Sequence, residues 1–464
     1  MLTKLAFKNF KAWKDSGEIR LAPLTVLFGA NSAGKSSITQ LLLMLKQTTE
    51  SSDRQRALHL GNAQSLVDLG TYDEVVHGQD VKQPLEFSFE WSLKDVWQGH
   101  DPISGTFYTG DTIRFGAKLV ADDRHQPVVD SLEYDLLLNG SLSLDLSMQR
   151  LATQKKAKAE FEITSSIYDL TRSQGKPWPL PEPLRFYGFP PEVAARYQNA
   201  AFTADLVLAL ESLFQGIFYV GPLRENPKRL YLWAGEVPAH VGKEGAQAIE
   251  AILAARDRYF NFAANQKTKP LAEVVAERLQ AMNLIREFEI KPLGQHRKEY
   301  EVLVRTNPKL PLVKLTDVGF GVSQVLPVIV ECFYVPARSI VIFEQPEIHL
   351  HPRVQADLAD LFVDAIRARE NSSPRECQFI VESHSEHFLR RLQRRIAEEK
   401  LSKDDAALYF VDTFGSAASI QELDLDLFGN IANWPEGFFG DEMEDAVARS
   451  EAQARRMSRG KKGE

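Results

Sequence analysis

A glycine-rich turn near the N-terminus carries the residue types that bind a phosphate chain. The stretch TVLFGANSAGKSS fits the spacing G-x-x-x-x-G-K-[ST], with Gly29, Gly34, Lys35 and Ser36 in the fixed places. Backbone N–H groups of such a turn form a concave anion site, and the following helix N-terminus adds about half a positive charge. Lys35 would reach the β- and γ-phosphates, and the Ser36 hydroxyl would ligate Mg²⁺. The turn therefore predicts a site for ATP and Mg²⁺.

A second set of polar residues follows two apolar runs in the other half of the chain. The run at 339–343 is followed by Glu344 and Gln345. P-loop enzymes place their second Mg²⁺ contact on an acidic residue at a strand end. A later apolar run ends at Ser383–His384, where an imidazole could sense a γ-phosphate. A lone histidine is more often a core or capping residue, so His384 is a candidate only through its place in this series.

Another glycine-rich turn, DVGFGVSQ, opens a helix upstream of Glu344. It contains Gly319, Gly321 and Ser323, and a helix N-terminus is a ready anion site. Taken alone, the same turn is an ordinary helix start. His349 and His351 alternate like a pair of metal ligands, but no Cys or third His supports them, so we predict no metal there.

The elements that must position these residues can be read from the hydrophobic pattern. TVLF is typical of a buried strand, and ITQLLLMLKQ has the 3.6-residue spacing of a helix. From about residue 85 to 167 the period changes to two, which predicts an antiparallel meander packed on the sheet of the nucleotide-binding domain. Residues 243–282 are helical in composition but too short and irregular for a long coiled-coil arm.

Composition excludes several classes of protein. The chain has 464 residues and a formal net charge of −8, which argues against coating nucleic acid by bulk charge. Cys332 and Cys377 are its two cysteines and lie among apolar residues, so we expect buried thiols and no disulfide or zinc site. No run approaches 18 apolar residues, and the N-terminus does not read as a signal peptide. We therefore expect no membrane association and a cytoplasmic location.

The order of these motifs resembles the ABC-type ATPases of the SMC, RecF and OLD kind. The fold class implied is α/β, an ABC-type P-loop ATPase head with a mixed sheet, an antiparallel β subdomain and a helical insertion. In that family two protomers sandwich ATP, which implies a homo-oligomer formed through the ATPase heads. The implied phosphate contacts in the first turn are Gly29, Asn31, Ser32, Gly34, Lys35, Ser36 and Ser37.

The resemblance also assigns roles to the other motifs. Ser36 and Glu344 would hold Mg²⁺, and His384 would be the switch. The turn at 347–352 would face the second protomer. The γ-phosphate would be contacted in trans by the signature turn, with Gly319, Gly321 and Ser323.

One position departs from the family pattern. Most relatives have a catalytic glutamate directly after the Walker B acid, and this chain has Gln345. A glutamine positions water but cannot take its proton, and loss of a general base typically costs about 10²- to 10⁴-fold in rate. Glu347 could substitute, although it is expected in the dimer-facing turn. We predict slow or negligible hydrolysis and the use of ATP as a conformational ligand.

Within this superfamily the chain most resembles a group of bacterial ATPases that is similar to PtuA, the ATPase subunit of the Septu antiphage defence system. That resemblance implies an HNH nuclease partner of the PtuB kind. The stretches that carry it are VGPLRENPKRLY, DVGFGVSQVLP, EQPEIHLHP and NWPEGFF.

Two other functions remain as alternatives. The first is a RecF-like DNA repair and genome-maintenance ATPase that binds DNA directly, with a basic C-terminal end (ARRMSRGKKGE) as a candidate phosphate contact. The second is an OLD-type nuclease using Glu382, Asp424 and Asp426. Leucines alternate with these aspartates, so a half-buried strand explains them more simply.

The expected parts of the chain follow from these motifs and from the proline-rich stretch near residue 180. They are an N-terminal ATPase lobe with the P-loop (1–84), an antiparallel β insertion (85–176), a linker with a helical and strand insertion (177–313), a C-terminal ATPase lobe with signature, Walker B acid and switch histidine (314–400), and a C-terminal strand pair with the NWPEGFF segment and basic tail (401–464).

Overall fold

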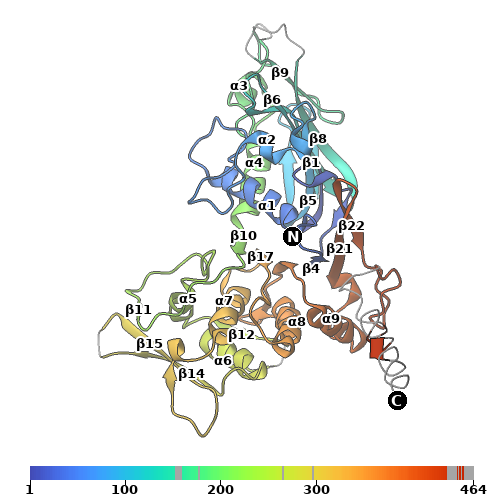
Figure 1. The fold of residues 1–464 in the computed structure, drawn as a ribbon. Coiled ribbons are helices and arrows are strands. Elements are labelled where there is room, and N and C mark those ends of the chain that lie inside the picture. The colour runs from blue at the N-terminus through green and yellow to red at the C-terminus, as the bar shows by residue number, and fades with distance from the viewer. Residues whose placement is uncertain are drawn as a thin grey trace, which may run out of the picture.

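A mixed six-stranded sheet lies at the centre of the computed structural model (Figure 1). The structure describes residues 1–151, 159–175, 178–263, 266–294, 297–435, 447, 449–450 and 452–453. The first five strands of the sheet are parallel and the last is antiparallel to its neighbour, which confirms the predicted fold class. In sheet order these strands are β10 (Ile217–Val220), β17 (Ile340–Glu344), β20 (Gln378–Glu382), β4 (Leu24–Gly29), β21 (Ala406–Phe414) and β22 (Ala417–Glu422).

The predicted meander forms a second, antiparallel sheet. It runs in chain order from β5 to β9, and β1 pairs with β5. The expected boundary between the parts 1–84 and 85–176 therefore separates two strands that belong to one sheet. The strands are β2 (Trp13–Asp15), β1 (Leu2–Phe10), β5 (Leu85–His100), β6 (Phe107–Ala121), β7 (Pro127–Leu138), β8 (Ser141–Arg150) and β9 (Phe161–Thr164), with β3 (Ile19–Arg20) paired to β1.

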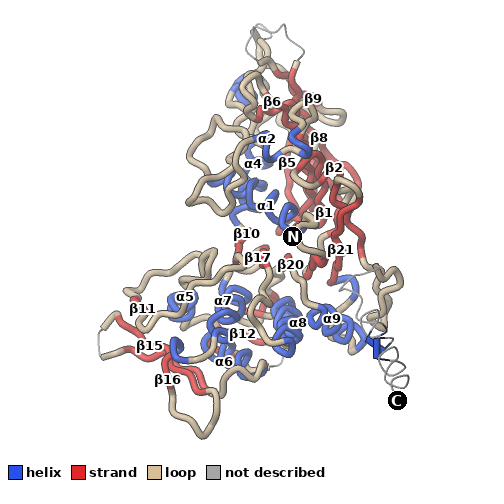
Figure 2. Tube along the Cα trace, viewed as in Figure 1, coloured by secondary structure: helices blue, strands red, loops and turns tan. Residues whose placement is uncertain are grey.

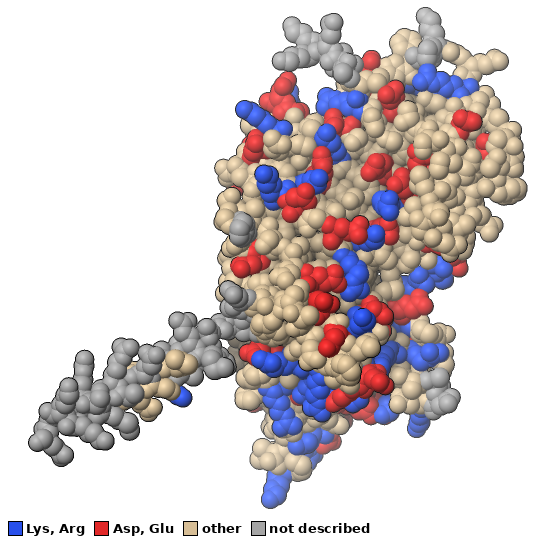
Figure 3. All heavy atoms as spheres, turned by 90° about the vertical axis from the view of Figure 1, so that its right-hand side faces the viewer, with Lys and Arg blue, Asp and Glu red and all other residues tan. Residues whose placement is uncertain are grey.

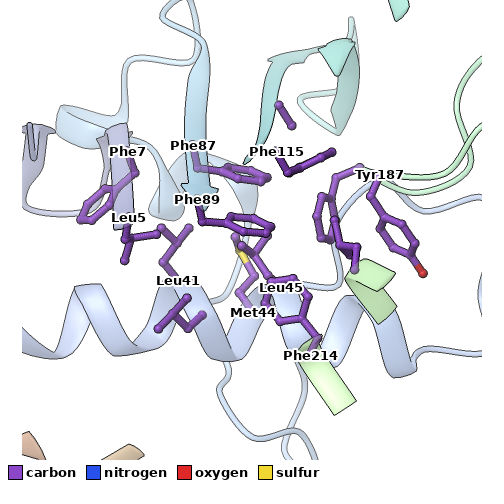
Figure 4. Packing of buried hydrophobic residues seen from close by; sticks show 14 of the residues in the cluster. Leu5, Phe7, Leu41, Met44, Leu45, Phe87, Phe89, Phe115, Tyr187 and Phe214 are labelled. Carbon is purple, nitrogen blue, oxygen red and sulfur yellow. The ribbon is translucent and has the colours of Figure 1, made fainter. Parts of the chain in front are cut away.

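Helices α1 (Lys35–Glu50) and α4 (Thr203–Gln215) pack between the two sheets. Figure 4 shows Leu41 and Leu45 of α1 pointing toward aromatic side chains of the antiparallel sheet. Smaller elements on this side of the chain are α2 (Tyr72–Val75), η1 (His77–Gln79) and α3 (Glu192–Arg196). The proline-rich stretch, expected to be a linker, packs here as well, because Leu180 pairs with Phe161 and both Phe186 and Tyr187 are buried.

The opposite face of the central sheet is covered by five helices, which gather in the lower part of Figure 2. They are α5 (Ala248–Ala254), α6 (Leu271–Ala281), α7 (Phe320–Tyr334), α8 (Pro352–Arg367) and α9 (Glu386–Ala397). Successive strand residues point to opposite faces. Ile340 and Ile342 accordingly join the core around α1, and Val341 and Phe343 join the core under α7 and α8.

Short strands complete the helical part, which includes α5 and α6. One small sheet holds β11 (Tyr231–Leu232), β15 (Glu299–Arg305), β14 (Glu287–Pro292) and β16 (Val313–Lys314); another holds β13 (Lys269–Pro270), β12 (Tyr259–Asn261), β18 (Arg369–Glu370) and β19 (Ser373–Pro374). Two 3₁₀ turns are η2 (Leu315–Asp317) and η3 (Lys403–Asp405). Within the described residues, no helix has the length and apolar character needed to cross a membrane.

Candidate nucleotide site

The predicted phosphate turn connects β4 to α1, as its sequence indicates. Gly29 and Gly34 have φ angles of 138° and 104°, which favour glycine. A Cβ on Gly29 would stand 1.9 Å from the Val411 carbonyl oxygen on β21. The Gly34 carbonyl accepts a hydrogen bond of 2.9 Å from the Trp13 indole. Packing against these neighbours fixes the turn, so both glycines are needed for its shape.

The N-terminus of α1 is open to an anion. Its cap residue is Gly34, which brings no side chain, and the first turn has no acidic residue. The Lys35 ammonium is buried and donates to the carbonyl oxygens of Gly29 and Ala30, at 3.0 and 2.6 Å. Burial lowers the pKa of Lys35, while nearby carboxylates oppose the shift. The turn therefore presents helix N–H groups and one buried cation.

Two carboxylates stand beside this turn on the α1 side of the sheet. Glu344 and Glu382 are register partners at the ends of β17 and β20. They continue the rows of Ile342 and Ile380, which face α1. Neighbouring strands lie about 4.8 Å apart, so the two side chains are adjacent. Alternation along each strand thus directs both acids toward the phosphate turn.

Each carboxylate accepts a hydroxyl from the first turns of α1. Ser36 Oγ donates to Glu382 Oε1 at 3.0 Å, and Thr39 Oγ1 donates to Glu344 Oε1 at 3.1 Å. Tyr219 Oη donates to the other Glu344 oxygen at 3.1 Å. Glu382 Oε2 is buried and has no hydrogen-bond partner in the described part of the chain.

The electrostatics of the pair favour a cation. Burial, and then the charge of Glu344, raise the pKa of Glu382 to about 7; burial also raises the pKa of Glu344. Mg²⁺ prefers oxygen ligands, and one or two carboxylates with a hydroxyl are a common protein contribution. The donor set of Ser36, Glu344 and Glu382, with its unpaired buried oxygen, fits that ion.

Glu382 is a nucleotide-site residue that the sequence motifs did not predict. The signal was present, because IVIFE and FIVE both read as an apolar strand that ends in glutamate. The sequence predicts that the second strand ends at Ser383–His384, which places the site residue after Glu382. In the structure β20 ends at Glu382.

The expected switch residues meet around a buried glutamate. Glu347 Oε1 accepts from Ser383 Oγ at 2.9 Å and from the His384 N–H at 2.6 Å. Burial raises the pKa of Glu347 and lowers that of His384, which the Lys35 charge lowers further. Glu347 thus connects the turn after β17 to the switch turn and does not project into solvent.

The backbone of Gln345 connects the ends of β17 and β20. Its N–H donates to the Glu382 carbonyl oxygen at 2.9 Å, and its φ is 44°. The left-handed conformation turns the chain sharply after β17. The glutamine therefore directly follows Glu344 at the site, as the sequence order predicts.

The signature turn lies in the helical layer on the opposite face of the central sheet from α1. Gly319 caps α7 and is exposed, with Gly321 in the first turn, and Ser323 Oγ donates to the Phe320 carbonyl oxygen at 2.9 Å. Because α7 packs on the opposite face of the sheet from α1, the structure does not place these residues in the cluster around Lys35. Asn31 and Ser32 are exposed at the tip of the phosphate turn.

Other candidates have structural explanations. His351 caps α8 by accepting from the Arg353 N–H, and His349 is exposed. Asp426 accepts from Phe428 and Asn430 within a local turn, while Leu423 and Leu425 are buried. Among the residues that the structure describes, no group of three or more His, Cys, Asp or Glu could hold a metal. The basic tail at 454–464 and residues 436–439 of the NWPEGFF segment lie outside the described residues.

A P-loop between a parallel strand and a helix, with acids at the ends of neighbouring strands, defines a P-loop nucleotide-binding protein. The model of the family described as AAA ATPase domain matches residues 1–162 and 247–389, more than half of the chain. The chain belongs to this AAA ATPase domain family. Residues 401–448 match a second family, described as a protein of unknown function (DUF3696). A search of curated proteins finds no significant match.

Several solved structures are similar at low identity. The SMC head bound to the C-winged helix domain of ScpA has 13% identity and a TM-score of 0.43, covering 91% of this chain and 98% of that chain. The SMC head domain from Thermotoga maritima has 12% identity and a TM-score of 0.40, covering 91% and 99%. The Pyrococcus furiosus SMC head with an extended coiled coil, bound to the ScpA C-terminal domain, has 12% identity and a TM-score of 0.41, covering 91% and 96%.

Proposed function

We propose that this chain is an ATP-binding head subunit whose nucleotide-dependent pairing controls a separate nuclease in an antiphage defence complex. The observation that carries nucleotide binding is the convergence of Lys35, Ser36 and the Glu344–Glu382 pair at one edge of the sheet. Membership of the AAA ATPase domain family supports the same conclusion.

The chain's own residues suit binding better than rapid turnover. ATP with Mg²⁺ supplies a polyanion and a divalent cation. The helix N–H groups and Lys35 would hold the phosphates, and Ser36, Glu344 and Glu382 would hold the metal. Gln345 cannot accept a proton, and Glu347 is engaged with Ser383 and His384. We therefore expect a barrier about 3–5 kcal/mol higher than with a well-placed general base.

Pairing of two heads would complete the site. The signature turn lies on the other face of the sheet from the phosphate turn, so a second copy would have to present it. Phe320 in that turn is 66% exposed, so a second copy could cover it. ATP held between the two copies would then serve as the signal for assembly.

The role of a nuclease partner rests on the resemblance to the PtuA group. The local turn around Asp426 gives that side chain a structural role, which argues against a nuclease site built on this chain's own C-terminal acids. Co-expression with an HNH protein encoded beside this gene should yield a complex that survives affinity purification. Elution of the chain alone, together with tight binding to duplex DNA, contradicts this part of the proposal.

Nucleotide binding is tested first on the purified chain. Titration calorimetry with ATP and Mg²⁺ should show saturable binding, and Lys35→Ala should abolish it because it removes the charge facing the β- and γ-phosphates. The control is Lys118→Ala, which alters an exposed ion pair on the antiparallel sheet. Absence of binding by the unaltered chain overturns the proposal.

One observation favours the RecF-like alternative. In Figure 3, Lys and Arg side chains gather over the lower part of the displayed face, with acidic side chains among them. Helix α9 carries two exposed arginines, Arg390 and Arg394, each paired with a glutamate four residues away. Direct DNA contact would replace these weak surface pairs, and duplex binding would then fall steeply with salt.

A further inference from the structure

The guanidinium group of Arg224 is buried near the edge of the nucleotide site, with no hydrogen-bond partner among the residues that the structure describes. All three of its guanidinium nitrogens are shielded from solvent, and none has a hydrogen-bond partner in the described part of the chain. A guanidinium carries five donors that suit carboxylate or phosphate oxygens. Leaving such a group desolvated and unpaired is strongly unfavourable, so its position calls for an anion.

The fold places Arg224 at the phosphate edge of the sheet. It follows the end of β10 by four residues, and β10 runs parallel to β17, whose end carries Glu344. The carboxyl ends of parallel strands meet at one edge of a sheet, which is where the phosphate turn also lies. Two backbone hydrogen bonds fix the segment, from Gly221 N–H to Lys243 and from Glu225 N–H to Glu244, at 2.8 and 2.9 Å.

Charges around Arg224 connect it to the same group of residues. Burial lowers its pKa to about 10, and the charges of Glu344 and Glu347 are among those that oppose this shift. Glu347 also interacts electrostatically with Lys35. Glu347 thus interacts electrostatically with both cations, Lys35 on α1 and Arg224 in the loop after β10.

The carboxylates in reach are largely committed elsewhere. Both oxygens of Glu344 accept hydroxyl groups, from Thr39 and Tyr219. Glu347 Oε1 accepts from the switch turn, and its Oε2 is buried without a hydrogen-bond partner within the described ranges. A direct Arg224–Glu347 ion pair is therefore the competing arrangement. Such a pair would be structural and indifferent to which nucleotide is bound.

We propose that Arg224 contacts the terminal phosphate of ATP bound to the same chain, and that it makes the site distinguish ATP from ADP. This inference rests on the proposed function, because it requires nucleotide in the P-loop. Lys35 contributes a point charge to the β- and γ-phosphates, whereas the planar Arg224 fork adds a bidentate contact that only the triphosphate offers. The residue makes the paired state specific for ATP.

The test compares two nucleotides on the full-length chain. Affinities for ATPγS and ADP are measured with Mg²⁺ for the unaltered chain, Arg224→Gln and Arg224→Lys. Loss of a charged hydrogen-bonding pair should weaken ATPγS binding about 10- to 100-fold in R224Q. ADP binding should change much less. R224K keeps the charge and should recover part of the ATPγS affinity.

Controls separate this inference from misfolding and from the proposed function. Arg114→Gln alters a surface ion pair on β6 and should leave both affinities unchanged. If R224Q does not fold, R224K carries the comparison. Equal loss of ATPγS and ADP affinity, or no loss of either, overturns the Arg224 role while nucleotide binding stands. Failure of the unaltered chain to bind either nucleotide overturns the proposed function and this inference together.

Discussion

Glu344 and Glu382 stand side by side at the ends of two parallel strands, and each accepts a hydroxyl from the first turns of the same helix. This arrangement links β17, β20 and α1 within one small region. The phosphate turn leads directly into α1, so an ion bound by Glu344 and Glu382 would affect the position of the phosphates. The site is therefore one unit, although its parts lie over 300 residues apart in the chain.

Without metal, this pair should make the protein less stable as the pH rises toward neutrality. The pKa of Glu382 in the folded chain is about 7 against an ordinary value of 4.5, through burial and the Glu344 charge. Between these values the folded state holds more protons than the unfolded state. The free energy of unfolding therefore falls with rising pH, by about 3 kcal/mol in total.

Urea denaturation in the presence of a chelator checks this slope. Glu382→Gln should flatten it between pH about 4.5 and about 7, because the group that loses its proton is gone. Saturating Mg²⁺ should flatten it as well. The exposed Glu18→Gln serves as the control and should keep the slope of the unaltered chain. An unchanged slope in E382Q contradicts the role given to this side chain.

The P-loop of this site was predictable from local sequence. The contacts between the P-loop helix and the distant strands were not. Closely spaced glycines predict the P-loop, and apolar residues at every second position predict the meander. The structure contains both. The Ser36–Glu382 contact depends on β20 lying between β17 and β4, which is a property of strand order. The proposed role of Arg224 depends on strand order as well, because β10 lies beside β17. Its motif VGPLRENP was visible, but no local rule connects it to Glu344.

Gln345→Glu should raise ATP turnover. It restores a group that can accept a proton from water directly after Glu344, and a positioned general base contributes about 10²- to 10⁴-fold. Release of inorganic phosphate under saturating ATP measures the change. Gln345→Ala is the matched control and should remain at or below the original rate. Turnover of several ATP molecules per second by the unaltered chain contradicts the prediction of slow hydrolysis.

Glu347→Ala should destabilise the chain and loosen the switch turn. It removes the acceptor of the Ser383 hydroxyl and the His384 N–H, and unsatisfied buried donors cost about 1–3 kcal/mol each. Chemical denaturation should therefore show a loss of about 2 kcal/mol or more. Ser383→Ala removes one of the two contacts and should lose less. Equal stability of E347A and the unaltered chain excludes this structural link.

The last prediction concerns which copy supplies each half of the paired site. Ser323→Arg should leave ATP binding nearly intact, because Ser323 lies in α7 on the other side of the sheet, yet it should block ATP-dependent pairing. Lys35→Ala should block pairing by abolishing binding. A mixed pair of one K35A chain and one S323R chain places the intact phosphate turn of the second against the intact signature turn of the first. One complete site results, so ATP should restore pairing in the mixture but in neither variant alone. Analytical ultracentrifugation of differently labelled chains measures this, and failure of the mixture to pair, with each variant folded, rules out contact in trans.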